Sequence, residues 1–128
     1  MATALVLAPA GCLGGDEEDP RPATGAPAAV AAVVDRLERA IARKDFATVC
    51  GELFTARARE RAGGDDCERQ LRSAAEGVER PAIEVRRIDV KGDRASVEVR
   101  TDARGQARVT DTLELRREGD RWLVEALG

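Results

Sequence analysis

The 128-residue sequence predicts one α+β domain, in which helices come first and a four-stranded antiparallel sheet follows. The first observation is the spacing of apolar residues, which keeps a helical period of about 3.6 from residue 30 to residue 78. The second is a change to two-residue alternation after residue 82, interrupted by short glycine-containing turns. The length suits a single domain with its own core.

A long first helix is predicted from Pro27 or Ala28 to Arg43 or Lys44. Proline is tolerated in a first helical turn, and positive charges suit a helix C-terminus. The apolar face consists of residues three or four positions apart, which are Val30, Val33, Val34, Leu37 and Ile41.

Shorter helices are expected next. Asp45 can cap a second helix, and Thr55 can cap a further turn through Arg61 that ends at Gly63-Gly64. Asp65 and Glu68 have the spacing of a capping box for one more helix, which Gly77 or Pro81 would close. The apolar faces of these helices are Phe46, Val49, Cys50 and Leu53, then Cys67, Leu71, Ala74, Ala75 and Val78.

The first strand changes its pattern half-way. Ile83 and Val85 have one parity, and Ile88 and Val90 have the other. A bulge at Arg86-Arg87 would return both pairs to one face of the sheet.

Three turns separate the remaining strands, at Lys91-Gly92-Asp93, from Asp102 to Gly105, and at Glu118-Gly119-Asp120. In the last strand, Trp122, Val124 and Ala126 are expected on one face, with Leu123 and Leu127 on the other. The two middle strands each have one apolar row: Ala95, Val97 and Val99 in the first of them, and Ala107, Val109, Leu113 and Leu115 in the second.

The N-terminal region is predicted to be a signal segment and a tether. Residues 1–12 contain an uncharged apolar run and small residues directly before Cys12, a pattern that resembles a bacterial lipoprotein signal with Cys12 as the lipidated residue. No basic residue precedes the run, so we expect a start codon further upstream; the alternative is a disordered cytoplasmic tail. Residues 13–26 are rich in Gly, Pro and acidic residues and are expected to be a disordered tether before the folded domain of residues 27–128.

Two cysteines remain in the domain, Cys50 and Cys67, and both fall on apolar helix faces. We expect a disulfide between them, in an extracytoplasmic and membrane-anchored or secreted protein. The alternative is a pair of buried free thiols. No metal site is expected, because two cysteines without any histidine are too few ligands for structural zinc.

The composition argues against most enzymes and against nucleic-acid binding. Histidine and tyrosine are absent, which removes common proton-transfer and oxyanion-binding groups. The net charge of −3 arises before residue 27, and from there on basic and acidic residues are equal in number. The domain therefore has no excess of positive charge that would attract nucleic acid or anionic lipid. Contact with a membrane is expected only through a lipid anchor at Cys12.

The order of elements resembles the nuclear transport factor 2-like superfamily. The residues that carry this resemblance are Lys44-Asp45-Phe46 at a helix start and the final segment from Gly119 to Val124. The chain is most similar to small actinobacterial lipoproteins in which two cysteines flank a Leu-Phe-Thr-like segment, as Cys50 and Cys67 flank residues 53–55. The resemblance implies a cone, with helices in the concave face of a curved sheet and a pocket at its open end.

Such a pocket would be lined by Val34, Leu37, Val97, Val109, Asp111, Leu113 and Trp122, with Trp122 filling the core rather than serving as a ligand platform. Asp111 shares the inward parity of Val109 and Leu113, and an inward carboxylate is unusual. It either contacts a polar ligand or pairs with an arginine or water. We expect a noncatalytic binding or scaffold domain without a cofactor, its partner a small apolar molecule or an envelope protein. The alternatives are a weak ketosteroid-isomerase or polyketide-cyclase-like enzyme using Asp111, and a structural homodimer.

Overall fold

The computed structural model describes residues 25–127. The predicted signal segment of residues 1–12, its Cys12 and nearly all of the tether lie outside this range. The helical part consists of α1 (Ala26–Ala42), α2 (Phe46–Thr48), the π-helix η2 (Val49–Leu53), α3 (Ala56–Arg61), the 3-10 helix η3 (Gly64–Asp66) and α4 (Cys67–Ala74). The strands are β1 (Ala82–Lys91), β2 (Arg94–Asp102), β3 (Val109–Glu118) and β4 (Arg121–Leu127).

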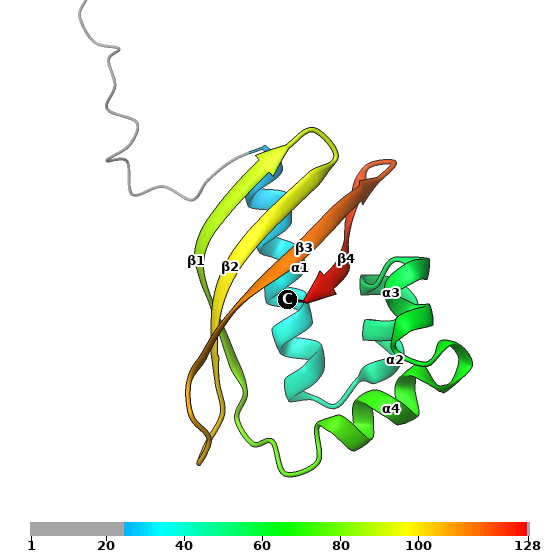
Figure 1. Ribbon diagram of the computed structural model, residues 1–128, viewed down its shortest axis with the longest axis vertical. Helices are drawn as coiled ribbons and strands as arrows, with labels where there is room; N and C mark the ends of the chain where they lie inside the picture. Colours follow the sequence, from blue (N-terminus) through cyan, green and yellow to red (C-terminus); the bar gives the residue numbers. More distant parts are fainter. Residues whose placement is uncertain (1–24, 128) are drawn as a thin grey trace, which may run out of the picture.

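The predicted α+β architecture is confirmed. The four strands form one antiparallel sheet in the order β1-β2-β3-β4, and the sheet curves across α1 (Figure 1). The short helices lie beside α1 and β4, away from β1 (Figure 1). Among the described residues, no helix is both long and apolar enough to cross a membrane.

The first strand contains the predicted bulge. Val85 pairs with Val99 and Arg87 pairs with Glu98, so Arg86 is the additional residue. The bulge keeps Ile83 and Ile88 on the concave face, where both pack against the core.

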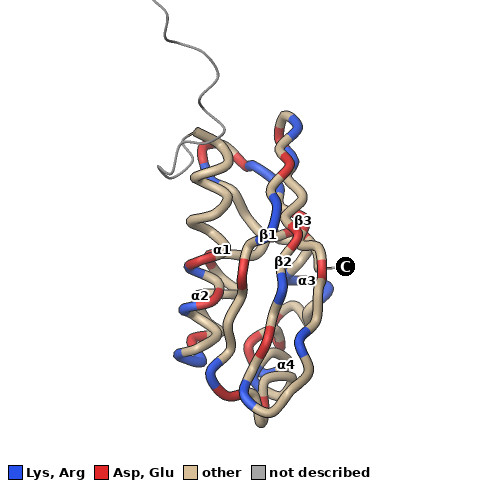
Figure 2. The backbone as a smooth tube through the Cα atoms, turned by 90° about the vertical axis from the view of Figure 1, so that its left-hand side faces the viewer, with Lys and Arg blue, Asp and Glu red and all other residues tan. Residues whose placement is uncertain are grey.

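The core lies between α1 and the concave face of β2, β3 and β4. Val30 and Val34 of α1 are at most 1% exposed, as are Val97 and Val99 of β2. Burying such a side chain contributes about 1.5–3 kcal/mol relative to leaving it in water. Charged residues of both signs are mixed along β1 and β2 (Figure 2).

The last strand contains a second bulge, which the sequence pattern did not predict. Leu115 pairs with Val124, but Glu114 pairs with Ala126 and Leu113 with Leu127, so Glu125 is the additional residue. One extra residue reverses the alternation beyond it. The expectation that Ala126 shares a face with Val124 is therefore wrong, and Leu127 takes that place.

The predicted caps are found at two of three positions. The side chains of Asp45 and Thr55 accept hydrogen bonds from the backbone N–H groups of Thr48 and Ala58. The Asp65–Glu68 capping box is not formed. The chain enters α4 through η3, which makes Asp66 the residue before the helix, and its side chain caps nothing. Asp66 instead pairs with the exposed Arg69 at 2.8 Å.

Candidate functional site

An apolar cavity of about 530 Å³ lies at the end of the cone where the short helices meet β3 and β4. Fifteen of its seventeen lining residues are apolar. The volume falls in the range of about 300–1,000 Å³ typical of small-molecule pockets. This cavity is the candidate functional site.

The inner wall comes from α1 and the sheet. Leu37 and Ile41 lie one helical turn apart on α1, so both side chains point the same way. Leu113 and Val124 form the sheet side of the cavity, and Leu127 joins them because the bulge at Glu125 turns it toward this face.

The outer wall is α4 and the residues after it. Leu71, Ala75 and Val78 face the cavity, and none of them is fully buried. Only one residue of α4, Cys67, is buried in the protein. The helix therefore packs loosely against the rest of the domain.

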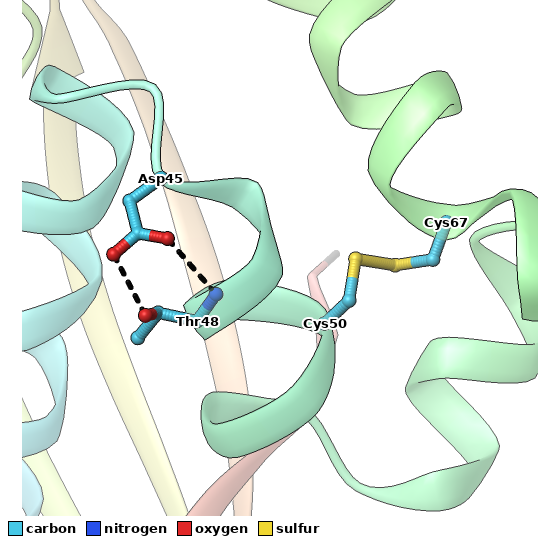
Figure 3. Close-up of a disulfide and its surroundings, with 4 residues drawn as sticks. All are labelled: Asp45, Thr48, Cys50 and Cys67. Atoms are coloured by element: carbon cyan, nitrogen blue, oxygen red, sulfur yellow. Dashed lines mark hydrogen bonds between the residues drawn. A yellow bond between two sulfur atoms is a disulfide. The ribbon is translucent and has the colours of Figure 1, made fainter.

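A disulfide holds α4 in place. Sγ of Cys50 in η2 is bonded to Sγ of Cys67, the first residue of α4, and both residues are at least 96% buried (Figure 3). The pairing that we expected is therefore formed. A second contact lies further along α4, where the Arg72 guanidinium sits 5.9 Å from the centre of the Phe46 ring. These two contacts position the outer wall of the cavity.

The polar rim consists of Arg61 and Glu125, which interact with each other. Nη2 of Arg61 donates a hydrogen bond to the Glu125 carbonyl oxygen at 2.6 Å and lies 4.0 Å from its carboxylate. The carboxylate also accepts a hydrogen bond from the Thr55 hydroxyl at 2.7 Å. Both ionisable groups of the lining are thus already occupied by protein partners.

One carboxyl near these helices has a perturbed pKa. The pKa of Asp45 is lowered from its ordinary value, chiefly because its carboxylate accepts a hydrogen bond from the Thr48 hydroxyl at 2.7 Å (Figure 3). The Thr48 N–H and, less strongly, the nearby Arg43 lower the pKa further, and desolvation opposes them. Asp45 is exposed, caps α2 and does not line the cavity, so its role is in the local fold.

The predicted pocket residues separate into three groups, two of which lie around α1. Leu37 and Leu113 line the cavity. Val34 and Val97 lie instead in the packed core, and Trp122 fills the core as expected; each is at most 5% exposed. The interior of the cone is filled at their level, because α1 packs directly onto the sheet there.

The remaining two predicted pocket residues lie at the start of β3, near the loop that joins β2 to β3. Val109 is 47% exposed. Asp111 pairs with Val99 and has the expected inward parity, but it is only half-buried and does not line the cavity. A catalytic role of Asp111 stays a prediction.

The sequence reasoning did not identify the outer wall or the rim. Leu71, Ala75 and Val78 were recognised as part of an apolar helix face but were not assigned to the pocket. The available signal was the pair of small adjacent side chains, Ala74 and Ala75, on this face, and both line the cavity. Phe54, Arg61 and Glu125 carry no such signal, since their positions depend on a contact between α3 and β4.

Comparison with solved structures identifies the fold. A nuclear transport factor 2-like protein of unknown function from Silicibacter pomeroyi matches with a TM-score of 0.61 and 21% identity, over 79% of this chain and 91% of that chain. A putative nuclear transport factor 2-like transpeptidase from Campylobacter jejuni matches with a TM-score of 0.56 and 14% identity, over 76% and 97%. Another nuclear transport factor 2-like protein of unknown function, from Shewanella baltica, matches with a TM-score of 0.54 and 16% identity, over 78% of this chain and 91% of that chain.

No known protein-family model matches the sequence, and no curated protein is significantly similar to it. At these identities the structural matches establish the nuclear transport factor 2-like fold and nothing about activity.

Proposed function

We propose that this chain, built on the nuclear transport factor 2-like fold, is a noncatalytic binding protein whose cavity takes a small apolar ligand outside the cytoplasm. The observation that carries the proposal is the cavity of about 530 Å³, with fifteen apolar residues among its seventeen lining residues. An apolar ligand gains free energy from leaving water for such a lining, at about 25 cal/mol per Å² of buried apolar area.

Binding is favoured over catalysis by the state of the ionisable groups. General acid–base chemistry needs a group that can exchange a proton with the substrate. Arg61 and Glu125 are held by each other and by Thr55, and Asp111 lies outside the lining. The cavity offers apolar contact and shape, which are the requirements of binding.

The extracytoplasmic location is supported by the disulfide and by the sequence before the domain. Disulfides between buried cysteines persist in oxidising compartments. The apolar run and small residues before Cys12 add a route to the membrane through lipid attachment. Replacing Cys12 with Ser should abolish incorporation of a labelled fatty acid and release the protein from the membrane fraction.

The ligand proposal is tested with an uncharged fluorescent dye, Nile red, and the full 128-residue chain in its oxidised form. The dye should bind with one site per chain. Replacing the cavity residue Ala75 with Leu should weaken binding about fivefold or more, because added methylenes crowd the site. Ala32→Leu, on the exposed face of α1, is the matched control and should leave binding unchanged.

Two results would contradict the proposal. One is the absence of any saturable dye binding to the folded chain. The other is equal binding by the Ala75→Leu and Ala32→Leu variants, which would place the dye outside the cavity.

A further inference from the structure

A cationic depression adjoins the apolar cavity. It has a volume of about 360 Å³ and is lined by three basic residues, Lys44, Arg80 and Arg104. They come from three segments that are far apart in the sequence: the end of α1, the loop before β1 and the loop between β2 and β3. Glu79 is the one acidic residue among the nine that line it.

The backbone brings these basic residues together. The N–H of Arg104 donates a hydrogen bond to the carbonyl oxygen of Glu79 at 2.8 Å, which ties the β2–β3 loop to the segment before β1. The N–H of Lys44 bonds to the carbonyl oxygen of Ile41 at 3.0 Å, which holds Lys44 at the end of α1. The cluster is therefore positioned by main-chain contacts that do not depend on its charged side chains.

The three basic side chains form no ion pair with another described residue. Within residues 25–127, the ion pairs with an N–O distance of at most 4.0 Å involve other arginines, among them Arg36, Arg61 and Arg108, and none includes Lys44, Arg80 or Arg104. With Glu79 counted against them, the depression carries an excess of positive charge that an anion can use.

The depression and the cavity share part of their walls. Ile41, Ala75 and Val78 line both spaces. The basic cluster therefore lies directly across these three side chains from the apolar cavity. The polar rim of the cavity does not suit an anion. Arg61 is already bonded to Glu125, and the Glu125 carboxylate would repel a second negative charge.

We propose that the ligand is an anionic amphiphile, with its alkyl chain in the apolar cavity and its carboxylate or phosphate head between Lys44, Arg80 and Arg104. This inference rests on the proposed binding function and adds the chemical class of the ligand. Each methylene buried in the cavity should strengthen binding about fourfold until the cavity is full. The head group should add an attraction that salt weakens.

The test compares ligands with the same ten-carbon chain and different heads. Decanoate, decyl phosphate, decanol and decylammonium are titrated calorimetrically, below their micelle concentrations, into the full oxidised chain. Decanoate and decyl phosphate should bind about five- to tenfold more tightly than decanol, as expected for two or three partly exposed ion pairs. Decylammonium should bind more weakly than decanol. A preference between the two anions identifies the head group.

The location of the head is tested with two double variants of equal charge change. Arg80→Gln with Arg104→Gln should remove the advantage of the anions and leave decanol binding unchanged. Arg94→Gln with Arg116→Gln is the control; these arginines face each other on exposed positions of β2 and β3 and line neither space. It should behave as the wild type.

The outcomes separate this inference from the proposed function. Equal binding of decanoate and decanol, or an anion advantage that survives loss of Arg80 and Arg104, overturns the inference and leaves the proposed function standing. If none of the four ligands binds and Nile red does not bind either, both are wrong.

Discussion

The hydroxyl oxygen of Thr55 lies 2.7 Å from Oε1 of Glu125, which joins the start of α3 to the end of β4 across seventy positions of sequence. Thr55 is 2% exposed, and its hydroxyl has a second role as the acceptor for the N–H of Ala58. The bulge at Glu125 makes this contact possible, because it places an additional residue in β4 beside α3. One hydroxyl thus both caps a helix and holds that helix against the sheet at the rim of the cavity.

Replacing Thr55 with Val should destabilise the protein by about 2 kcal/mol. The variant keeps the shape of the side chain but loses the cap and the hydrogen bond to a charged group. Urea unfolding followed by the fluorescence of Trp122, the single tryptophan, measures the change. Thr55→Ser retains the hydroxyl and should lose clearly less stability; an equal loss in both variants would show that the missing methyl group matters and the hydroxyl does not.

Removing the disulfide should lower both stability and ligand binding. The double variant Cys50→Ala with Cys67→Ala should lose about 3 kcal/mol, because the bridge closes a loop of seventeen positions in the unfolded chain. Nile red binding should weaken as well, since α4 has little other burial to hold it as the outer wall. Dye binding is measured under conditions in which the variant is folded, and stability is measured by urea unfolding that starts from those conditions. Unchanged dye affinity in the folded variant would show that α4 is positioned without the bridge.

Buried and exposed valines of the sheet should respond differently to truncation of their side chains. Val97→Ala should cost about 1–3 kcal/mol, because the valine is fully buried beneath α1 and its loss leaves a cavity. Val109→Ala should change stability by less than about 0.5 kcal/mol, since that side chain is half exposed. Comparable losses of stability in the two variants would contradict the conclusion that the interior is closely packed around Val97.

The acid stability of the domain should depend on Asp45. Its pKa is lower in the folded protein than its ordinary value of 3.8, because the Thr48 hydroxyl and N–H bond the charged carboxylate. The stabilisation is therefore present above pH 3.8 and is lost as the pH falls through the lower folded pKa. Thermal unfolding of Asp45→Asn between pH 6 and pH 2 should show a smaller decrease in melting temperature over this acidic range than the wild type.

A matched variant shows whether the effect belongs to the cap. Asp93→Asn removes an exposed carboxylate in the β1–β2 turn, 3.7 Å from Arg117, where no cap is formed. It should keep the acid dependence of the wild type. The same flattening in both variants would trace the effect to net charge and not to the Asp45–Thr48 hydrogen bonds.

Much of the fold was predictable because it depends on neighbouring residues. The bulge at Arg86 followed from the change of parity between Val85 and Ile88, which is visible within a few positions. The cap at Thr55 depends on the helix directly after it. The pairing of Cys50 with Cys67 followed from the count of cysteines and from their apolar helix faces.

The candidate site was only partly predictable. Leu37 and Leu113 were assigned to the pocket because their parity points inward. The same reasoning placed Val97 and Trp122 there, but parity gives the face of an element and not whether another element already covers it. The hollow end of the cone was therefore not located from the pattern.

The sequence by itself determined the order of helices and strands, most turns and caps, and the two cysteines available for a disulfide, because each depends on periodicity, on the chemistry of a few adjacent residues or on a count. The tertiary structure alone decided the bulge at Glu125, its hydrogen bond to Thr55, and the position of Arg80 beside Arg104. These features arise where segments distant in sequence meet, and the free energy that fixes them comes from contacts that exist only once the chain has folded.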